Sequence, residues 1–321
     1  MFLEKIFWKT AGAVFTPNGN RARLSILTYH SVLPEVDPLC PGSISKNEFE
    51  KLIKYLSTYF NILPLDKAVE LLRQGNLPGR AVAITFDDGY ADNHDIALPI
   101  LNKYKAQATF FIATGFLNGG IMWNDCIIET IRRINHNTVD LSELCLDMYE
   151  LNTWQQRYSA TQDIISKLKY FEPNERLHKV KELAEFCNIS LPDNLMMTTE
   201  QVIKMHENGM TIGGHTVNHP ILSAVDDNRA WQEIVEGKKS LENMINDQVK
   251  LFAYPNGKPN KDYTSTHIEM LKKAGFKAAV TTEWGCTKKQ NLDNYQLSRF
   301  TPWDKNNRKF GMRLMLNCLK C

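Results

Sequence analysis

The stretch AVAITFDDGYADNHDIALPILNKYKAQATFFIAT, residues 81–114, decides the fold. Its first six residues, and later residues 108–114, are apolar enough to form strands buried on both faces. Between them, residues 93–105 have the apolar spacing of an amphipathic helix. A strand, a helix and a second strand in this order predict parallel pairing through a right-handed crossover.

The same alternation continues on both sides of this unit. Ser45 followed by Glu48 has the spacing of a helix capping box, and Gly75 and Gly209 are typical helix stops. We expect further strands at residues 24–30, 210–215, 251–255, 277–282 and 295–300, and helices at 45–59, 66–75, 198–209, 227–245 and 264–274. This alternation indicates an α/β layer fold or an α/β barrel, with functional sites at the C-terminal ends of the strands.

Two segments depart from the alternation. Residues 120–197 have helical periodicity at 125–133, 153–168 and 175–186, which predicts a helical insertion within a single domain spanning 1–321. The tail at about 305–321 mixes cationic and apolar residues. It fits either a terminal helix packed on the domain or a segment lying on an anionic membrane surface.

The composition is that of an ordinary soluble globular protein, with 43% hydrophobic and 23% charged residues. A formal net charge of +2 argues neither for nor against nucleic-acid binding. No basic block is long enough to follow a phosphate backbone, so we expect no nucleic-acid partner. No window is suited to a membrane-spanning helix, and the N-terminal segment has no clear export signal. Seven scattered cysteines fit reduced thiols. We therefore expect a cytoplasmic protein, or one attached peripherally to the cytoplasmic face of the membrane by its basic termini.

The motif TFDDGY, residues 85–90, places two adjacent carboxylates where a buried strand ends. Like charges repel, and a metal cation that binds one carboxylate leaves the other ionised as a base. Gly89 permits the sharp turn out of the strand. Taken alone, the motif is also compatible with a helix cap or a solvated turn.

A second motif, GGHTVNHP at residues 213–220, places His215 and His219 four positions apart. On one helical turn, both imidazoles would face the same way. Two histidines and one carboxylate form a common open metal site, suited to zinc and also to iron, cobalt, nickel or manganese. Histidines at this spacing are found on plain surface helices as well.

Two further motifs follow predicted strands. FAYPNG, residues 252–257, either aims a backbone N–H at a developing oxyanion or simply forms a tight turn. TYHSV, residues 28–32, ends the first strand at His30. An imidazole there is suited to protonate a leaving amine near neutral pH, although a histidine at a strand end is often structural.

Together, these motifs closely resemble the polysaccharide deacetylase family, also called the NodB homology domain. The resemblance covers about residues 24–116 and 198–300, and TFDDGY with H-x-x-x-H is its most specific part. It implies a distorted (β/α) barrel with fewer than eight regular strands. It also implies a metal-dependent hydrolase that removes N-acetyl groups from an N-acetylhexosamine-containing polysaccharide or glycan intermediate.

The resemblance also implies the roles of individual residues. Asp88, His215 and His219 would bind one divalent metal ion, with zinc as the expected ion. Asp87 would be the general base, and the backbone N–H of Asn256 would help to hold the oxyanion. The required chemistry, an activated water, a stabilised oxyanion and a proton for nitrogen, agrees with this distribution of roles.

Two features depart from the usual family pattern. The proton-donating histidine usually lies near the C-terminus, but LSRFTP, residues 297–302, contains none. The branch that acts on poly-N-acetylglucosamine has a Y-H-x-V motif near its N-terminus instead, which TYHSV matches, so His30 takes the acid role. The arginine that usually orients the base is replaced by Ala253, and we expect Arg299 to supply that charge from another direction.

Three aromatic residues beside these motifs are expected to contact the sugar: Tyr90, Trp123 and Tyr254. Trp123 opens the insertion and is suited to stack on a sugar ring, but it is equally compatible with anchoring the insertion. The expected partner is an N-acetylated glycan.

Two other functions stay open at this point. The same metal set would serve to hydrolyse another amide in a small molecule, for which a closed pocket is expected rather than a broad groove. A non-catalytic sugar-binding protein is the second alternative. The alanine at position 253 favours it, whereas the intact Asp87 beside Asp88 argues against it.

Overall fold

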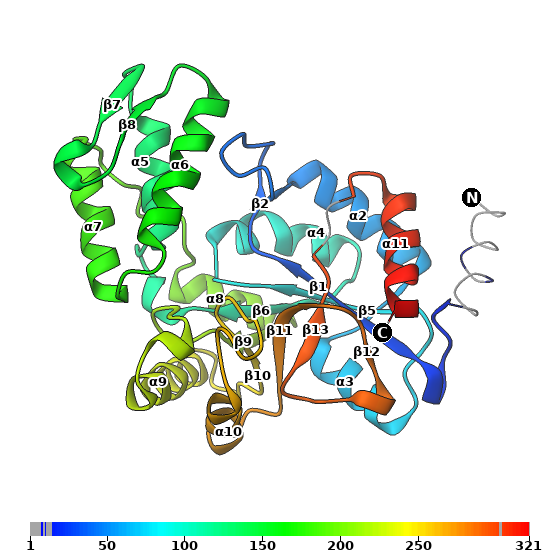
Figure 1. Cartoon of the computed structure of the whole chain (residues 1–321). Coiled ribbons are helices and arrows are strands. Elements are labelled where there is room, and N and C mark those ends of the chain that lie inside the picture. Colours follow the sequence, from blue (N-terminus) through cyan, green and yellow to red (C-terminus); the bar gives the residue numbers. More distant parts are fainter. Residues whose placement is uncertain (1–7, 9, 11–14, 302–303, 321) are drawn as a thin grey trace.

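A computed structural model describes residues 15–301 and 304–320, together with Trp8 and Thr10. Its main sheet consists of β1 (Arg23–Tyr29), β4 (Asn61–Ile62), β5 (Ala81–Phe86), β6 (Thr109–Ile112), β9 (Thr211–Gly214), β10 (Leu251–Ala253), β11 (Ala278–Trp284), β12 (Thr287–Lys288) and β13 (Leu297–Arg299). The strand order is β12-β1-β5-β6-β9-β10-β11-β13, with β4 beside β5 (Figure 1). The pairs are parallel except for β12, which lies antiparallel to β1.

The sheet curves until its two ends meet. The N–H of Phe300, directly after β13, donates to the carbonyl of Ile26 at 2.7 Å, and the N–H of Thr28 donates to the carbonyl of Phe300 at 3.1 Å. Alternate strand residues form one apolar cluster, which includes Leu24, Ile26, Ala81, Ala83, Leu251, Ala253 and Leu297. We call the sheet face that carries this cluster the inner face. The nearly closed barrel confirms the predicted fold class.

Helices cover the other face of the sheet. They are α2 (Lys46–Tyr59), α4 (Leu98–Lys103), α8 (Thr199–Glu207), α9 (Asp227–Ile245) and α10 (Ser265–Lys273), whereas α3 (Leu65–Gln74) packs against the inner cluster. The predicted capping box is present, because the Ser45 hydroxyl accepts from the Glu48 N–H and the Glu48 carboxylate accepts from the Ser45 N–H. Gly75 ends α3 in the left-handed conformation, at φ 78°.

The insertion forms a lobe beside the barrel, drawn in green in Figure 1. It contains α5 (Trp123–Arg133), β7 (Thr138–Asp140), β8 (Met148–Glu150), α6 (Trp154–Leu168) and α7 (Pro173–Phe186), and it has its own apolar core. The three helices lie where the sequence predicts them, at 125–133, 153–168 and 175–186, within a residue or two. The prediction included no strands, but β7 and β8 pair as an antiparallel hairpin. Strands of three residues are too short for an alternating pattern to reveal them.

The C-terminal tail forms α11 (Asn307–Lys320), which contacts α2 and β1. Phe310, Leu314 and Met315 are buried there, whereas Met312 and Leu316 are exposed. The packed face agrees with the prediction of a terminal helix docked on the domain. In the described part of the chain, no helix combines the length and apolarity needed to cross a bilayer. The basic N-terminal segment predicted to attach to membranes lies mostly outside the described residues.

Candidate active site

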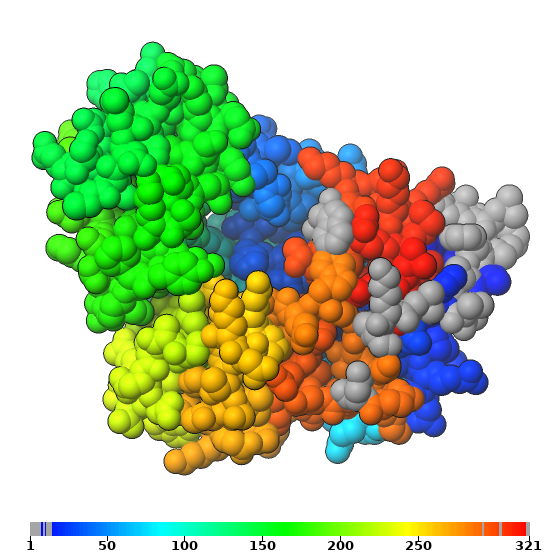
Figure 2. Space-filling view, viewed as in Figure 1, coloured from blue at the N-terminus to red at the C-terminus, as the bar shows by residue number. Residues whose placement is uncertain are grey.

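The residues of all four motifs lie at one end of the barrel. His30 follows β1, Asp87 and Asp88 follow β5, His215 follows β9, Tyr254 and Asn256 follow β10, and Arg299 ends β13. Because these strands are parallel, their C-terminal ends meet at one edge. The motif residues line a cleft of about 910 Å³ whose second wall is the insertion. Figure 2 shows this hollow between the green lobe and the barrel.

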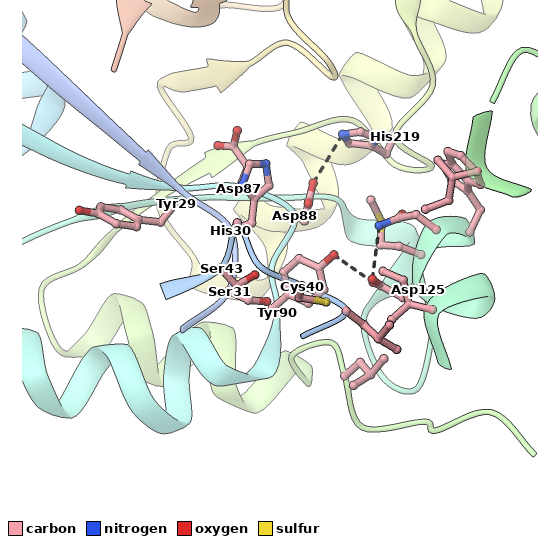
Figure 3. Close-up of a pocket in the computed structure, with 18 of the residues that line it drawn as sticks. Tyr29, His30, Ser31, Cys40, Ser43, Asp87, Asp88, Tyr90, Asp125 and His219 are labelled. Carbon is pink, nitrogen blue, oxygen red and sulfur yellow. Dashed lines mark hydrogen bonds and ion pairs between the residues drawn. The ribbon is translucent and has the colours of Figure 1, made fainter. Parts of the chain in front are cut away.

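Three of these side chains have the arrangement of a metal site. Asp88 Oδ1 lies 3.4 Å from His215 Nε2 and 3.5 Å from His219 Nε2, and all three ligand atoms lie within 4.8 Å of one another. Figure 3 shows Asp88 and His219 facing each other in the pocket. Two ligands bound tetrahedrally to a zinc ion would be about 3.4 Å apart. Within the described residues, Asp88 Oδ1 is buried and has no hydrogen-bond partner, as expected for an oxygen that binds a metal ion.

Each of the two histidines offers Nε2 to a metal. Burial opposes protonation of His215, but the carboxylates of Asp88 and Asp87 raise its pKa. His215 Nδ1 lies 2.7 Å from the carbonyl of Ala253, so Nδ1 carries the proton and Nε2 keeps its lone pair. Burial lowers the pKa of His219 to about 4, which keeps its imidazole in the neutral, metal-binding form near pH 7. Although burial opposes ionisation of Asp88, the two histidines hold the pKa of its carboxyl well below the usual range.

The segment between the histidines is a loop, and the predicted helical turn is wrong. Thr216 and His219 are both left-handed, at φ 66° and 52°. The N–H groups of Val217 and Asn218 donate to the buried carboxylate of Glu233 in α9, at 3.0 and 2.7 Å, instead of entering a helix. Sequence analysis had no signal for Glu233, because the contact depends on how α9 packs beside the loop.

Glu233 should therefore position His219. We expect Glu233→Ala to weaken metal binding about 10-fold, as the loss of a group that supports a metal ligand does. The measurement is a competitive zinc titration against a chromophoric chelator. Glu236→Ala, an exposed glutamate one turn along α9, is the matched control and should bind as the native protein does. Equal affinities for all three proteins would contradict this role.

The second carboxylate of the pair does not join the metal set. Arg299 donates from Nη1 to Asp87 Oδ1 at 2.8 Å and from Nη2 to Oδ2 at 2.7 Å, and both side chains are buried. Burial raises the pKa of the Asp87 carboxyl, but the charge of Arg299 more than offsets this and the net shift is downward. Asp87 is thus held as an oriented carboxylate beside Asp88.

His30 and Asn256 reach the same cleft from opposite sides. The His30 ring is exposed to the cleft, and its backbone is held by Asn93 Nδ2, which donates to the His30 carbonyl at 2.8 Å. In the same loop, the Val32 N–H donates to the Asp92 carboxylate at 3.1 Å. Asn256 is left-handed at φ 58°, and its N–H has no hydrogen-bond acceptor within the described residues.

The three aromatic residues predicted to contact the sugar all line the cleft, but each also contacts other protein groups. The Tyr90 hydroxyl donates to Asp125 at 2.9 Å. Tyr254 is buried and stacked on Tyr263 at 3.7 Å between ring centroids. The guanidinium of Arg176, in the insertion, covers one face of Trp123 at 4.5 Å from the ring centroid. The ring therefore also anchors the lobe.

Sequence comparisons agree with this geometry. The family model for polysaccharide deacetylase matches residues 74–174 and 175–279. The chain is 24% identical over 266 residues to YxkH of Bacillus subtilis, covering 82% of this chain and 66% of YxkH. It is also 24% identical over 220 residues to the poly-beta-1,6-N-acetyl-D-glucosamine N-deacetylase of Staphylococcus epidermidis, covering 63% of this chain and 71% of that enzyme.

Solved structures share the fold. The Streptococcus pyogenes deacetylase PplD, in complex with acetate, superposes with a TM-score of 0.61 at 19% identity. The alignment covers 92% of this chain and 98% of PplD, so the barrel and most of the chain outside it have counterparts there.

Proposed function

We propose that this chain, which belongs to the polysaccharide deacetylase family, is a metal-dependent hydrolase that removes acetyl groups from an N-acetylhexosamine-containing glycan. The observation that carries the proposal is that two adjacent carboxylates have different partners. Asp88 faces two histidine nitrogens, and Asp87 is held apart by Arg299. A binding protein has no need of an oriented, ionised carboxylate beside a metal set.

Asp88, His215 and His219 would hold the metal, which is zinc in our proposal. A divalent cation held there would supply Lewis-acid polarisation of the acetyl carbonyl and of the attacking water. Asp87 takes a proton from that water, and Arg299 keeps the carboxylate in position to do so. The free N–H of Asn256 donates to the oxygen on which negative charge develops. His30, on the opposite side of the cleft, protonates the leaving amine.

The shape of the cleft favours a glycan over a very small amide. Its volume of about 910 Å³ is near the upper end of the range of about 300–1,000 Å³ for small-ligand sites. Hydroxyl, amide and charged groups from both the barrel and the insertion line it, as recognition of a sugar chain requires.

Removal of the metal provides the direct test. The zinc-loaded protein should release acetate from N-acetylglucosamine oligomers, and dialysis against a chelator should abolish the release. Addition of one equivalent of zinc should restore it, with cobalt and manganese tested in parallel. Release that survives complete metal removal would contradict the proposal. No release from the zinc-loaded protein would leave another amide or a binding role as the function.

A further inference from the structure

Two cationic side chains, Lys169 and Arg176, lie on the insertion wall of the cleft. Lys169 directly follows α6, and Arg176 lies in the first turn of α7. Both line the same cleft as Asp88 and His215. Within the described residues, neither side chain forms a salt bridge.

Arg176 is the stronger indication, because it is buried, with only 7% of its surface exposed. Its Nη1 donates to the carbonyl of Lys169 at 2.9 Å, but its Nε is buried and has no hydrogen-bond partner. The nearby Glu172 uses its carboxylate to cap α7, accepting from the N–H groups of Asn174 and Glu175. A buried charge is costly unless it is paired, so a guanidinium with an unused donor indicates an anionic ligand.

The neighbouring side chains suit such a ligand. The ring of Trp123 lies 4.5 Å below the guanidinium and fixes its plane. Tyr158 and Gln162 of α6 line the same wall and add neutral polar groups. Two acids that line the cleft, Asp37 and Glu129, pair with Arg132 at 2.5 and 2.8 Å. The carboxylate of a third, Asp125, accepts from the Tyr90 hydroxyl at 2.9 Å.

We infer that Lys169 and Arg176 bind an anionic group of the substrate, a phosphate or a carboxylate carried on the glycan that is deacetylated. The planar guanidinium and the adjacent ammonium match the oxygens of either group. Because the two cations and the metal set share one cleft, the anion and the acetamide belong to the same molecule. This inference rests on the proposed function, and it assigns an acidic glycan as the substrate class.

Calorimetric titration of the zinc-loaded, full-length protein tests the binding directly. The probes are N-acetylglucosamine 6-phosphate, N-acetylmuramic acid and neutral N-acetylglucosamine. We expect one acidic sugar to bind at least 10-fold more tightly than the neutral one, and the two acidic probes distinguish phosphate from carboxylate. Equal affinity for all three sugars would overturn the inference.

Variants separate this site from the metal, which also attracts anions. Lys169→Gln should lose the preference for the acidic sugar, and Arg176→Gln should do the same if its melting temperature shows that it folds. Lys181→Gln removes an exposed charge from α7 that does not line the cleft, and it should keep the preference. A preference that persists in both Lys169→Gln and Arg176→Gln would come from the metal site and would overturn the inference.

Acetate release distinguishes this failure from failure of the proposed function. Equal turnover of acidic and neutral oligosaccharides, with a KM that Lys169→Gln leaves unchanged, means that the enzyme is a deacetylase without an anion site. Tight binding of an acidic sugar without acetate release from any substrate means that the anion site exists and that the proposed activity is wrong.

Discussion

Replacement of Asp87 by asparagine should lower kcat for acetate release by about 10²- to 10⁴-fold, the usual contribution of a general base. Asparagine keeps the shape of the side chain but cannot accept the proton of the attacking water. The carboxylate lies outside the metal set, since its two oxygens are bound to Arg299. Zinc content, measured by atomic emission, should therefore stay at one equivalent.

A matched substitution controls for the loss of one negative charge. Asp95→Asn makes the same chemical change eight residues after Asp87, on an exposed side chain that does not line the cleft. Its kcat should equal that of the native protein. If Asp87→Asn also retained native turnover with zinc bound, Asp87 would be a structural partner of Arg299, and the base would have to be sought elsewhere in the cleft.

The parts of the fold that could be predicted from sequence are those with a local physical cause. The helix expected at 227–245 is α9, because Asp226 accepts from the Arg229 N–H and apolar residues recur on one face. The motifs lie together because parallel strands present their C-terminal ends at one edge, which follows from the order of the elements. An α/β fold with polar groups at the C-terminal ends of its strands could be predicted without knowledge of packing, whereas the choice of a barrel followed from the family resemblance.

The features that could not be predicted depend on contacts between distant segments. The loop from His215 to His219 is held by Glu233, fourteen residues beyond the second histidine, and no helical or strand period connects them. The sequence places Arg176 in an amphipathic helix, where an arginine is common. Only the structure shows that it is buried beside Trp123 with an Nε that has no hydrogen-bond partner. Such residues become visible only when the packing of segments distant in the sequence is known.

The role of Arg299 was predicted from sequence, but its reason is structural. The pleat of the sheet explains its position. Leu251 and Ala253 of β10 and Leu297 of β13 belong to the inner cluster, and Arg299 is two residues beyond Leu297. Side chains two apart share one face of a strand, so positions 253 and 299 both point inward at the mouth of the barrel. An arginine at either position would approach the same carboxylate, Asp87.

We expect Arg299→Ala to lower the free energy of unfolding by about 3–5 kcal/mol, the range for removal of one partner from a buried ion pair. Asp87 would be left buried without its counter-charge, and its carboxylate would lose the two hydrogen bonds that orient it. We expect kcat to fall at least 10-fold in addition. Urea unfolding of the metal-free protein measures the first effect, and acetate release by the zinc-loaded protein measures the second.

Two companion variants show whether orientation or charge matters. Arg299→Lys keeps the charge but cannot bind both carboxylate oxygens, so it should recover stability more than turnover. Ala253→Arg in the Arg299→Ala background places a guanidinium on the inward face of β10, which β11 separates from β13. It should restore at least part of kcat. Native turnover in Arg299→Ala would show that Asp87 acts without this support, and the pairing would then serve stability alone.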